Sequence, residues 1–217
     1  NNQNPVTAIS EAVAKIGSHE WPQTYTKAVK ELFTAIADAL GKPLGNDYRE
    51  FLIEIPSVAR MIAATLQNTA NPTMLEAGYK ANVIPKEASA VIDGRFLPGH
   101  EDALNRTIAE IVGPDIKIET VTHDIALEVP FEGALVDAMK AAILKLDPEG
   151  IPVPYLMSGG TDNKALSELG IVGYGFSPLR LPADLDFMAL FHGVDERIPL
   201  ESLDFGVKAL EDFLLNS

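Results

Sequence analysis

Residues 73–121 read TMLEAGYKANVIPKEASAVIDGRFLPGHEDALNRTIAEIVGPDIKIETV, and this stretch decides the fold. Two short runs, 73–80 and 88–97, have the length and composition of β-strands, and apolar residues recur at helical spacing over 101–112. From 115 to 121 apolar and charged residues alternate, which is typical of a half-buried strand. The order β-β-α-β is most of a ferredoxin-like, split βαβ sandwich, which usually starts with one more strand before a first helix.

Helical patterns lie on both sides of this stretch. Before it, apolar residues three or four apart predict three helices, at 4–17, 26–40 and about 58–66. After Pro130 helical patterns alternate with short apolar runs: helices at 135–146, 162–169 and 203–214, strands at 152–157 and 171–176. Such alternation predicts parallel α/β layers. A change of composition near 124–131 predicts a boundary between two domains, 1–123 and 124–217.

The composition excludes several classes of protein and site. Of the 217 residues 47% are hydrophobic and 22% charged, and the formal net charge is −14, so a nucleic-acid partner is not expected. No apolar run approaches the ~18 residues of a membrane span. The sequence has no cysteine, so a metal would have to use histidine and carboxylate ligands, and we expect a reducing, cytoplasmic location.

One histidine has the sequence context of a metal ligand. His192 follows an apolar run, stands beside Gly193, and precedes an amphipathic helix. Ile198 is biased away from the helical region by Pro199, which places His192 in an ordered loop. A packed or surface histidine is the structural alternative. Because this loop is not helical, we interpret Glu196 as a capping or ion-pairing residue, not a second ligand.

A glycine-rich turn lies about thirty residues earlier, at Gly159-Gly160-Thr161-Asp162. In the structural interpretation Thr161 or Asp162 caps the helix predicted at 162–169. In the functional interpretation the two glycines let a ligand approach the main chain, and the free N–H groups attract a carboxylate or oxyanion. The two interpretations are compatible.

Polar residues in the strand region offer substrate contacts. Asn82 and Arg95 lie on or beside neighbouring strands. Arg95 is either paired with Asp93 on the strand surface or a guanidinium fork for a substrate carboxylate. His100 precedes a helix and is interpreted as part of its N-terminal cap region, and His123 is expected to be solvated.

These stretches, taken in order, resemble the di-zinc aminoacylase/carboxypeptidase family, which includes acetylornithine deacetylase, succinyl-diaminopimelate desuccinylase and carboxypeptidase G-type enzymes. The resemblance is carried by Asn82-Val83-Ile84-Pro85, Val91-Ile92-Asp93-Gly94-Arg95, Ser158-Gly159-Gly160-Thr161-Asp162 and His192-Gly193-Val194-Asp195-Glu196-Arg197-Ile198-Pro199. It implies an α/β protein in which 1–123 is a partial α+β lid or dimerisation domain, lacking its first strand, and 124–217 is the C-terminal lobe of the catalytic domain.

The resemblance also implies roles for these residues. His192 matches the last metal-ligand histidine of the family. Arg95 and Asn82 match lid residues that engage the substrate, and Gly159, Gly160 and Thr161 match a pocket loop, with Asp162 beside it. Two zinc ions would share a hydroxide that attacks the amide of a small peptide or N-acyl amino acid.

The family's other metal ligands, including a His-x-Asp motif and a Glu-Glu pair, lie in an N-terminal lobe that this sequence lacks. No residue of this chain is therefore predicted to be catalytic, and the chain alone is predicted to be inactive and to bind no zinc. The expected partners are the missing lobe and, through the lid, a second copy. Two alternatives remain, a non-catalytic dimerisation or binding module and one half of a split enzyme.

Overall fold

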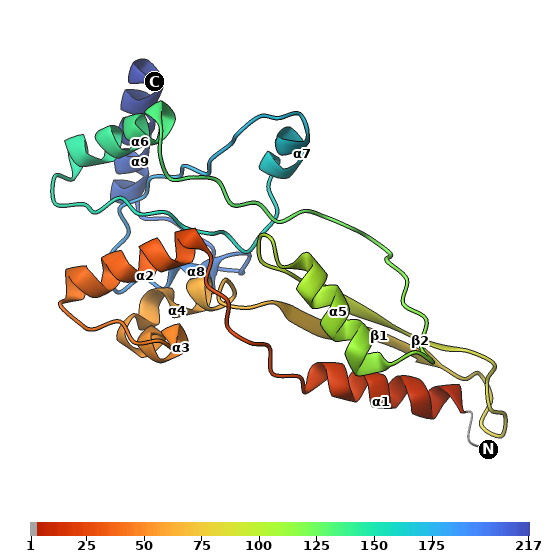
Figure 1. Cartoon of the computed structure of the whole chain (residues 1–217). Helices are drawn as coiled ribbons and strands as arrows, with labels where there is room; N and C mark the ends of the chain where they lie inside the picture. Colours follow the sequence, from red (N-terminus) through yellow and green to blue (C-terminus); the bar gives the residue numbers. More distant parts are fainter. Residues whose placement is uncertain (1–3) are drawn as a thin grey trace. The chain divides into compact units, whose positions relative to one another are not determined.

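The structure is a computed structural model that describes residues 4–217. It divides the chain into two compact units (Figure 1). Unit 1 contains the residues up to Thr24 together with Gln67–Leu127, and unit 2 contains Tyr25–Leu66 together with Glu128–Ser217. The chain therefore passes from unit 1 to unit 2, back to unit 1, and again to unit 2.

Unit 1 is a two-stranded antiparallel sheet covered by two helices. Its elements are α1 Pro5–Gly17, β1 Thr69–Ala77, β2 Ala88–Arg95 and α5 Glu101–Val112. The strands pair from Thr69 opposite Arg95 to Ala77 opposite Ala88, with an irregularity between Pro72 and Met74. Figure 1 shows α1 and α5 lying along this sheet.

One face of the sheet forms the core of unit 1. Gly94 lies on this face, where an added Cβ would be 3.1 Å from Leu104 Cδ2 of α5. The turn from β2 to α5 is closed by Asn68, whose Oδ1 accepts from Leu97 N at 2.9 Å and whose Nδ2 donates to His100 O at 3.0 Å. The buried residues of this core are Ile16, Trp21, Ala70 and Leu104.

Unit 2 begins with three helices and a turn. These are α2 Lys27–Leu40, α3 Tyr48–Phe51, a 3-10 turn Leu52–Glu54, and α4 Pro56–Ala63. Phe33 and Val29 of α2 are fully buried, and Phe33 stacks on Tyr48 with ring centroids 4.7 Å apart. The remaining buried members of this core are Leu32, Ala37, Phe51, Ile55, Ile62 and Leu66.

The second part of unit 2 contains four helices: α6 Ala134–Leu146, α7 Asn163–Glu168, α8 Phe187–Leu190 and α9 Leu200–Asn216. Figure 1 shows α6 beside α9, and an ion pair between Lys145 and Asp212 joins them. The short helix α8 contacts α4. Val153 and Leu156 pack against the core that α2–α4 form, so both parts of unit 2 share apolar contacts.

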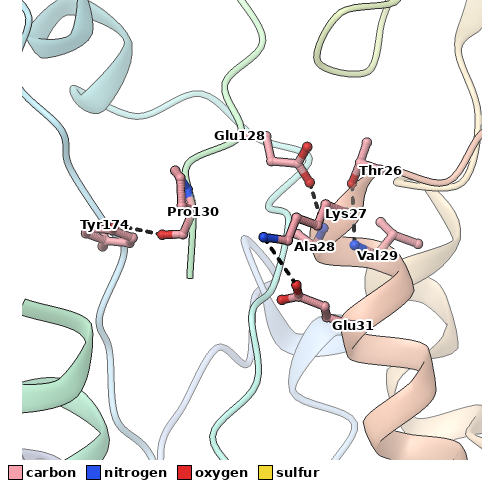
Figure 2. A network of polar contacts seen from close by, with 8 residues as sticks. All are labelled: Thr26, Lys27, Ala28, Val29, Glu31, Glu128, Pro130 and Tyr174. Atoms are coloured by element: carbon pink, nitrogen blue, oxygen red, sulfur yellow. Dashed lines mark hydrogen bonds and ion pairs between the residues drawn. The ribbon is translucent and has the colours of Figure 1, made fainter. Parts of the chain in front are cut away.

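The first turn of α2 carries two caps from different parts of unit 2 (Figure 2). Thr26 Oγ1 accepts from Val29 N at 3.4 Å, and Glu128 Oε1 accepts from Ala28 N at 2.7 Å. On the other side of the 128–130 segment, the Tyr174 hydroxyl donates to Pro130 O at 2.7 Å. Glu128 thus binds the re-entering chain to the start of α2, where an anion is favourable.

The helix predictions are confirmed, whereas three strand predictions are wrong for the described chain. Helices occur at all seven predicted places, and α3 and α8 add two short helices. Among residues 4–217 the named strands are β1 and β2, so 115–121, 152–157 and 171–176 form none. The pattern of apolar and polar residues along a segment predicts which side chains a strand there would bury. A strand also needs a neighbouring strand for its backbone hydrogen bonds, and the pattern does not supply one.

The α/β class is thus found in a coarse form, as helices with a two-stranded sheet. The predicted boundary near 124–131 coincides with the passage from Leu127 to Glu128. Residues 25–66, which lie inside the first predicted domain along the sequence, belong to unit 2 in space. The identification of 1–123 as lid and 124–217 as catalytic lobe stays a prediction.

Candidate functional site

His192 lies in a tight loop that follows α8. Asp186 caps that helix by accepting from Ala189 N at 3.0 Å, and Gly193 N donates to Leu190 O at 2.9 Å. The φ angle of His192 is +59°, and among the described non-glycine residues it alone is positive. The His192 ring stacks on Phe191 with centroids 4.4 Å apart. The loop therefore holds His192 in a backbone conformation that residues other than glycine rarely adopt.

Glu196 stabilises the same loop. Its Oε2 accepts from the backbone N of His192 at 3.2 Å, and its own N donates to Gly193 O at 3.4 Å. Glu196 thus bonds to a loop amide and not to the N-terminus of a helix, and whether it is a ligand stays untested. The carboxylate fixes the backbone of His192 and leaves the imidazole nitrogens for another partner.

The described residues do not form a metal site by themselves. No group of three or more histidine, aspartate and glutamate side chains within residues 4–217 is arranged to hold a metal ion. A zinc site needs three or four protein ligands, and His192 could supply one.

The Gly159–Asp162 turn leads into α7. Asp162 takes the N-cap position of α7, but its side chain makes no capping hydrogen bond, so that part of the capping prediction is wrong. The space around the two glycines is open: an added Cβ would meet Met157 Cε at 3.8 Å for Gly159 and Lys164 Nζ at 4.0 Å for Gly160. Thr161 O accepts from Lys164 N at 3.1 Å. Packing within the described chain therefore does not require glycine here.

Arg95 and Asp93 form an ion pair on the face of β2 opposite the core. The Arg95 Nε lies 3.0 Å from Asp93 Oδ2, and the Arg95 side chain is 65% exposed. Alternate strand residues point to opposite faces, so Arg95 and Asp93 share the face that Gly94 does not. The ion pair engages the Nε edge of the guanidinium, while bidentate binding of a carboxylate could use its Nη atoms.

The structure does not bring Asn82 and Arg95 together. Asn82 is exposed in the turn that joins β1 to β2, beyond the pair Ala77 and Ala88. Arg95 is at the other end of β2, seven residues from Ala88, which at the usual strand rise is roughly 23 Å. This separation is larger than a small substrate, so the two side chains of one copy cannot contact the same small substrate molecule.

The other two histidine interpretations have different outcomes. His100 takes the N-cap position of α5, as predicted, without a side-chain capping bond. His123 Nε2 lies 2.7 Å from Glu101 Oε1, so it is paired with the first turn of α5, although its side chain is half exposed. Glu128 was not singled out from the sequence, because its partner Ala28 is 100 residues away and no local pattern marks it.

A groove of about 520 Å³ lies in unit 1, at the C-terminal end of α5. None of the predicted site residues lines it. Its lining is Ala109, Glu110, Gly113, Pro114, Ile116 and Ile118. The last two are apolar residues of the segment 115–121, for which a strand was predicted.

Comparison with known proteins places the chain. Residues 1–118, more than half of the chain, match a family described as a peptidase dimerisation domain of the M20 group. The chain belongs to the M20 peptidase dimerisation-domain family. The sheet and helices of unit 1, with Arg95 and Asn82, fall within the matched residues.

Relatives also match the part beyond residue 118. The chain is 25% identical over 222 aligned residues to "Probable carboxypeptidase S-like 2" of Dictyostelium discoideum, covering 97% of this chain and 41% of that protein. It is 25% identical to "N-fatty-acyl-amino acid synthase/hydrolase PM20D1" of Mus musculus, covering 99% of this chain and 45% of that protein. The chain thus spans less than half the length of these relatives.

A solved structure shares the fold. It is an M20 family metallo-carboxypeptidase, Sso-CP2, from Sulfolobus solfataricus, with a TM-score of 0.57 and 17% sequence identity. The similarity covers 99% of this chain and 52% of that protein.

None of the helices that the structure describes is long and apolar enough to span a membrane.

Proposed function

We propose that this chain is the C-terminal portion of a metal-dependent amidohydrolase or peptidase, and that it is inactive alone. The observation that carries the proposal is coverage: nearly the whole chain aligns to the Dictyostelium relative, but to only 41% of that protein. The relatives are named for peptide or N-acyl amino acid chemistry. The unmatched part of such proteins has room for the ligands that the described residues lack.

The names of the relatives favour one class of substrate. A carboxypeptidase substrate and an N-fatty-acyl amino acid both contain an amide whose nitrogen belongs to an amino acid with a free carboxylate. A guanidinium binds a carboxylate through two parallel hydrogen bonds. We assign this role to Arg95, oriented by Asp93, and assign Gly159, Gly160, Thr161 and Asp162 to the pocket wall. Because Asn82 lies far from Arg95 in the same copy, we assign Asn82 to a different substrate molecule from the one that this Arg95 binds.

His192 is assigned as one ligand of a two-zinc centre whose other ligands lie outside this chain. Its loop supports this, since a backbone conformation of higher energy is maintained by Glu196 and Gly193 around an accessible ring. The described residues cannot hold zinc without those ligands, so no catalytic step is assigned to them. The lack of cysteine supports the cytoplasm as the compartment.

A second candidate is a non-catalytic dimerisation module. The family description of residues 1–118 favours it, because that description names association and not chemistry. In this case the chain would form a homodimer through unit 1 and bind no zinc. A split enzyme, with the other lobe on a separate chain, is the third possibility.

The decisive experiment compares the 217-residue chain with the complete polypeptide encoded by its reading frame. Both are dialysed against zinc and assayed with a dipeptide, N-acetyl-leucine and a long-chain N-acyl leucine. We expect turnover and bound zinc from the complete polypeptide only. Turnover by the purified 217-residue chain would contradict the proposal, whereas a zinc-free, inactive homodimer from the complete polypeptide would favour the module.

The role of Arg95 is tested in the complete polypeptide with Arg95→Met. Loss of a charge-assisted bidentate contact costs roughly 1.5–3 kcal/mol, so kcat/KM for N-acetyl-leucine should fall about 10- to 100-fold. With N-acetyl-leucinamide, which lacks the carboxylate, the variant and the wild type should be equal. Arg106→Met on the exposed surface of α5 is the matched control and should change neither value. An equal loss with both substrates would contradict the assignment.

A further inference from the structure

The Gly159–Asp162 turn has little support of its own in the described chain. Residues 158–162 are all exposed. Apart from its chain neighbours, a Cβ added to Gly159 or Gly160 would have no heavy atom nearer than 3.8 Å, and the Asp162 side chain makes no capping hydrogen bond. The turn must therefore be held in place through the residues that follow or precede it in the chain.

The helix that follows the turn is short. Helix α7 has 6 residues, and isolated helices of this length are not stable in water. Backbone hydrogen bonds join it to the turn, since Lys164 N donates to Thr161 O at 3.1 Å and Leu166 N donates to Asp162 O at 3.0 Å. A movement of α7 is thus transmitted to the turn, and the tertiary contacts of α7 decide where the turn lies.

The first residue of α7, Asn163, packs on the backbone of Gly173. A Cβ added to Gly173 would lie 2.2 Å from Asn163 Oδ1, 2.7 Å from its Cγ and 3.2 Å from its Nδ2. Real Cβ atoms essentially never come within 3.0 Å of another heavy atom, and 2.2 Å is the closest such approach at any glycine of the chain. The carboxamide of Asn163 therefore occupies the space that a side chain at position 173 would need.

Other contacts within unit 2 hold the segment that contains Gly173. The hydroxyl of its neighbour Tyr174 donates to Pro130 O at 2.7 Å (Figure 2). Phe176 contacts Phe213 of α9, with ring centroids 5.2 Å apart. The carboxamide on Gly173 thus rests on backbone that is itself fixed by two further side chains.

We propose that Asn163 is a positioning residue of the pocket: by lying on Gly173, its carboxamide holds the Gly159–Asp162 turn in the place where it meets the substrate. The inference rests on the proposed function, which assigns this turn to the pocket wall. Glycine at 173 serves close packing and not backbone conformation, since its φ is not left-handed. A displacement of about 1 Å at a substrate site can cost roughly 100-fold in rate, so this contact matters for turnover.

The first test measures the contact in the 217-residue chain and needs no activity. Amide hydrogen exchange of Lys164 and Leu166, followed by NMR, reports opening of the junction between turn and helix. Asn163→Ala removes the carboxamide and Gly173→Ala fills its space, so each should speed these amides by at least about 2-fold, the lower limit for residues in contact. The double variant should be no faster than the faster single variant, because both changes remove the same contact.

Gly175→Ala is the matched control. Gly175 lies in the same segment as Gly173, its φ is not left-handed, and an added Cβ would meet nothing within 4 Å. This variant should leave the exchange of Lys164 and Leu166 unchanged. An acceleration as large as that of Gly173→Ala would show that the loss of a glycine, and not the contact with Asn163, is responsible, and would overturn the proposal.

The second test separates positioning from stability in the complete polypeptide. Asn163→Ala and Gly173→Ala should each raise KM for N-acetyl-leucine about 10- to 100-fold, and the double variant by about the same factor as one of them. A merely structural role would lower the folded fraction, and hence the apparent kcat, at an unchanged KM. That result, or single-variant factors that multiply in the double variant, would overturn the proposal. Because Asn163→Ala only removes atoms, it keeps the test valid even where Gly173→Ala does not fold.

The two tests distinguish this inference from the proposed function. A complete polypeptide without turnover would refute the proposed function and with it the role of Asn163 in the pocket, although non-additive exchange would still establish the contact. Turnover that Asn163→Ala leaves unchanged, together with unchanged exchange, would overturn the inference and keep the proposed function.

Discussion

At the scale of the residue, His192 shows how a loop can hold an unfavourable backbone conformation. The φ angle of +59° is left-handed and costs an L-residue roughly 1 kcal/mol. Glycine is the usual residue at such positions. Here the Glu196 carboxylate binds the His192 backbone N, and Gly193 continues the turn. A side chain retained where glycine would be easier is consistent with a role for the imidazole, which is why we assign it as a ligand.

Tyr155 gives a pH dependence at the same scale. Burial raises the pKa of its phenol above the ordinary value of 10.0, and the hydroxyl makes a long hydrogen bond of 3.5 Å to Met61 O. Below pH ~9 the phenol is neutral in both the folded and the unfolded chain, so it makes its full contribution to the free energy of unfolding. As the pH rises through 10 the unfolded chain releases this proton first, and the free energy of unfolding falls.

We therefore expect the urea midpoint of the wild-type chain to decrease between pH 9 and pH 11. Tyr155→Phe should decrease less over this range, because phenylalanine has no proton to lose. Tyr79→Phe, at an exposed position in unit 1, is the control and should follow the wild type. Identical slopes for the wild type and Tyr155→Phe would show that the phenol titrates alike in both states.

At the scale of the element, the ends of the helices follow local rules. Asn4 Oδ1 accepts from Val6 N at 3.0 Å at the start of α1, followed by Pro5. Gly41 ends α2 with a φ of +63°, a conformation that glycine adopts without a steric penalty. The start of α2 differs, since Glu128 adds a cap from a distant part of the sequence. This second cap connects the stability of α2 to the fold of the C-terminal half.

We expect Thr26→Ala and Glu128→Ala each to lower the free energy of unfolding by about 1 kcal/mol, the usual value of a lost cap or charged hydrogen bond. The exposed pair Lys27 and Glu31, 3.7 Å apart, is the comparison (Figure 2). Glu31→Gln should cost less than ~0.5 kcal/mol. Urea unfolding followed by circular dichroism measures all three, and a Glu128→Ala value no larger than that of Glu31→Gln would contradict the second cap.

At the scale of the whole molecule, the two units have separate cores. Phe33 belongs to the core of unit 2 and Leu104 to that of unit 1, and both are almost fully buried. A cavity in one core removes contacts within that unit. Its effect on the other unit depends on how far the units unfold together.

Phe33→Ala should lower the free energy of unfolding of unit 2 by about 3–5 kcal/mol, and Leu104→Ala that of unit 1 by about 2–5 kcal/mol. Native-state hydrogen exchange resolves the two, because the protected amides of α2 and of β1–β2 report different units. We expect each variant to speed exchange mainly in its own unit. Equal acceleration in both units from either variant would show that they unfold as one.

The sequence by itself determined the places of seven helices and the family. Periodicity and capping residues depend on neighbours within a few positions, so α1, α2 and α5 were predicted nearly to the residue. Two of the four motif stretches that predicted the family, 82–85 and 91–95, lie within residues 1–118, which match its description. Local chemistry sufficed for these features because the interactions that cause them are local.

Only the tertiary structure decided which segments meet. It grouped residues 25–66 with the C-terminal half, and it placed Asn82 in the turn before β2 and Arg95 at the far end of that strand. It also left large apolar side chains of α9, such as Val207 and Leu214, exposed. Strands need partners from distant sequence, and burial depends on what covers a face, so alternation at 115–121 predicted a strand that lacks a neighbour. The pairing energy of such segments belongs to long-range contacts, which no local pattern contains.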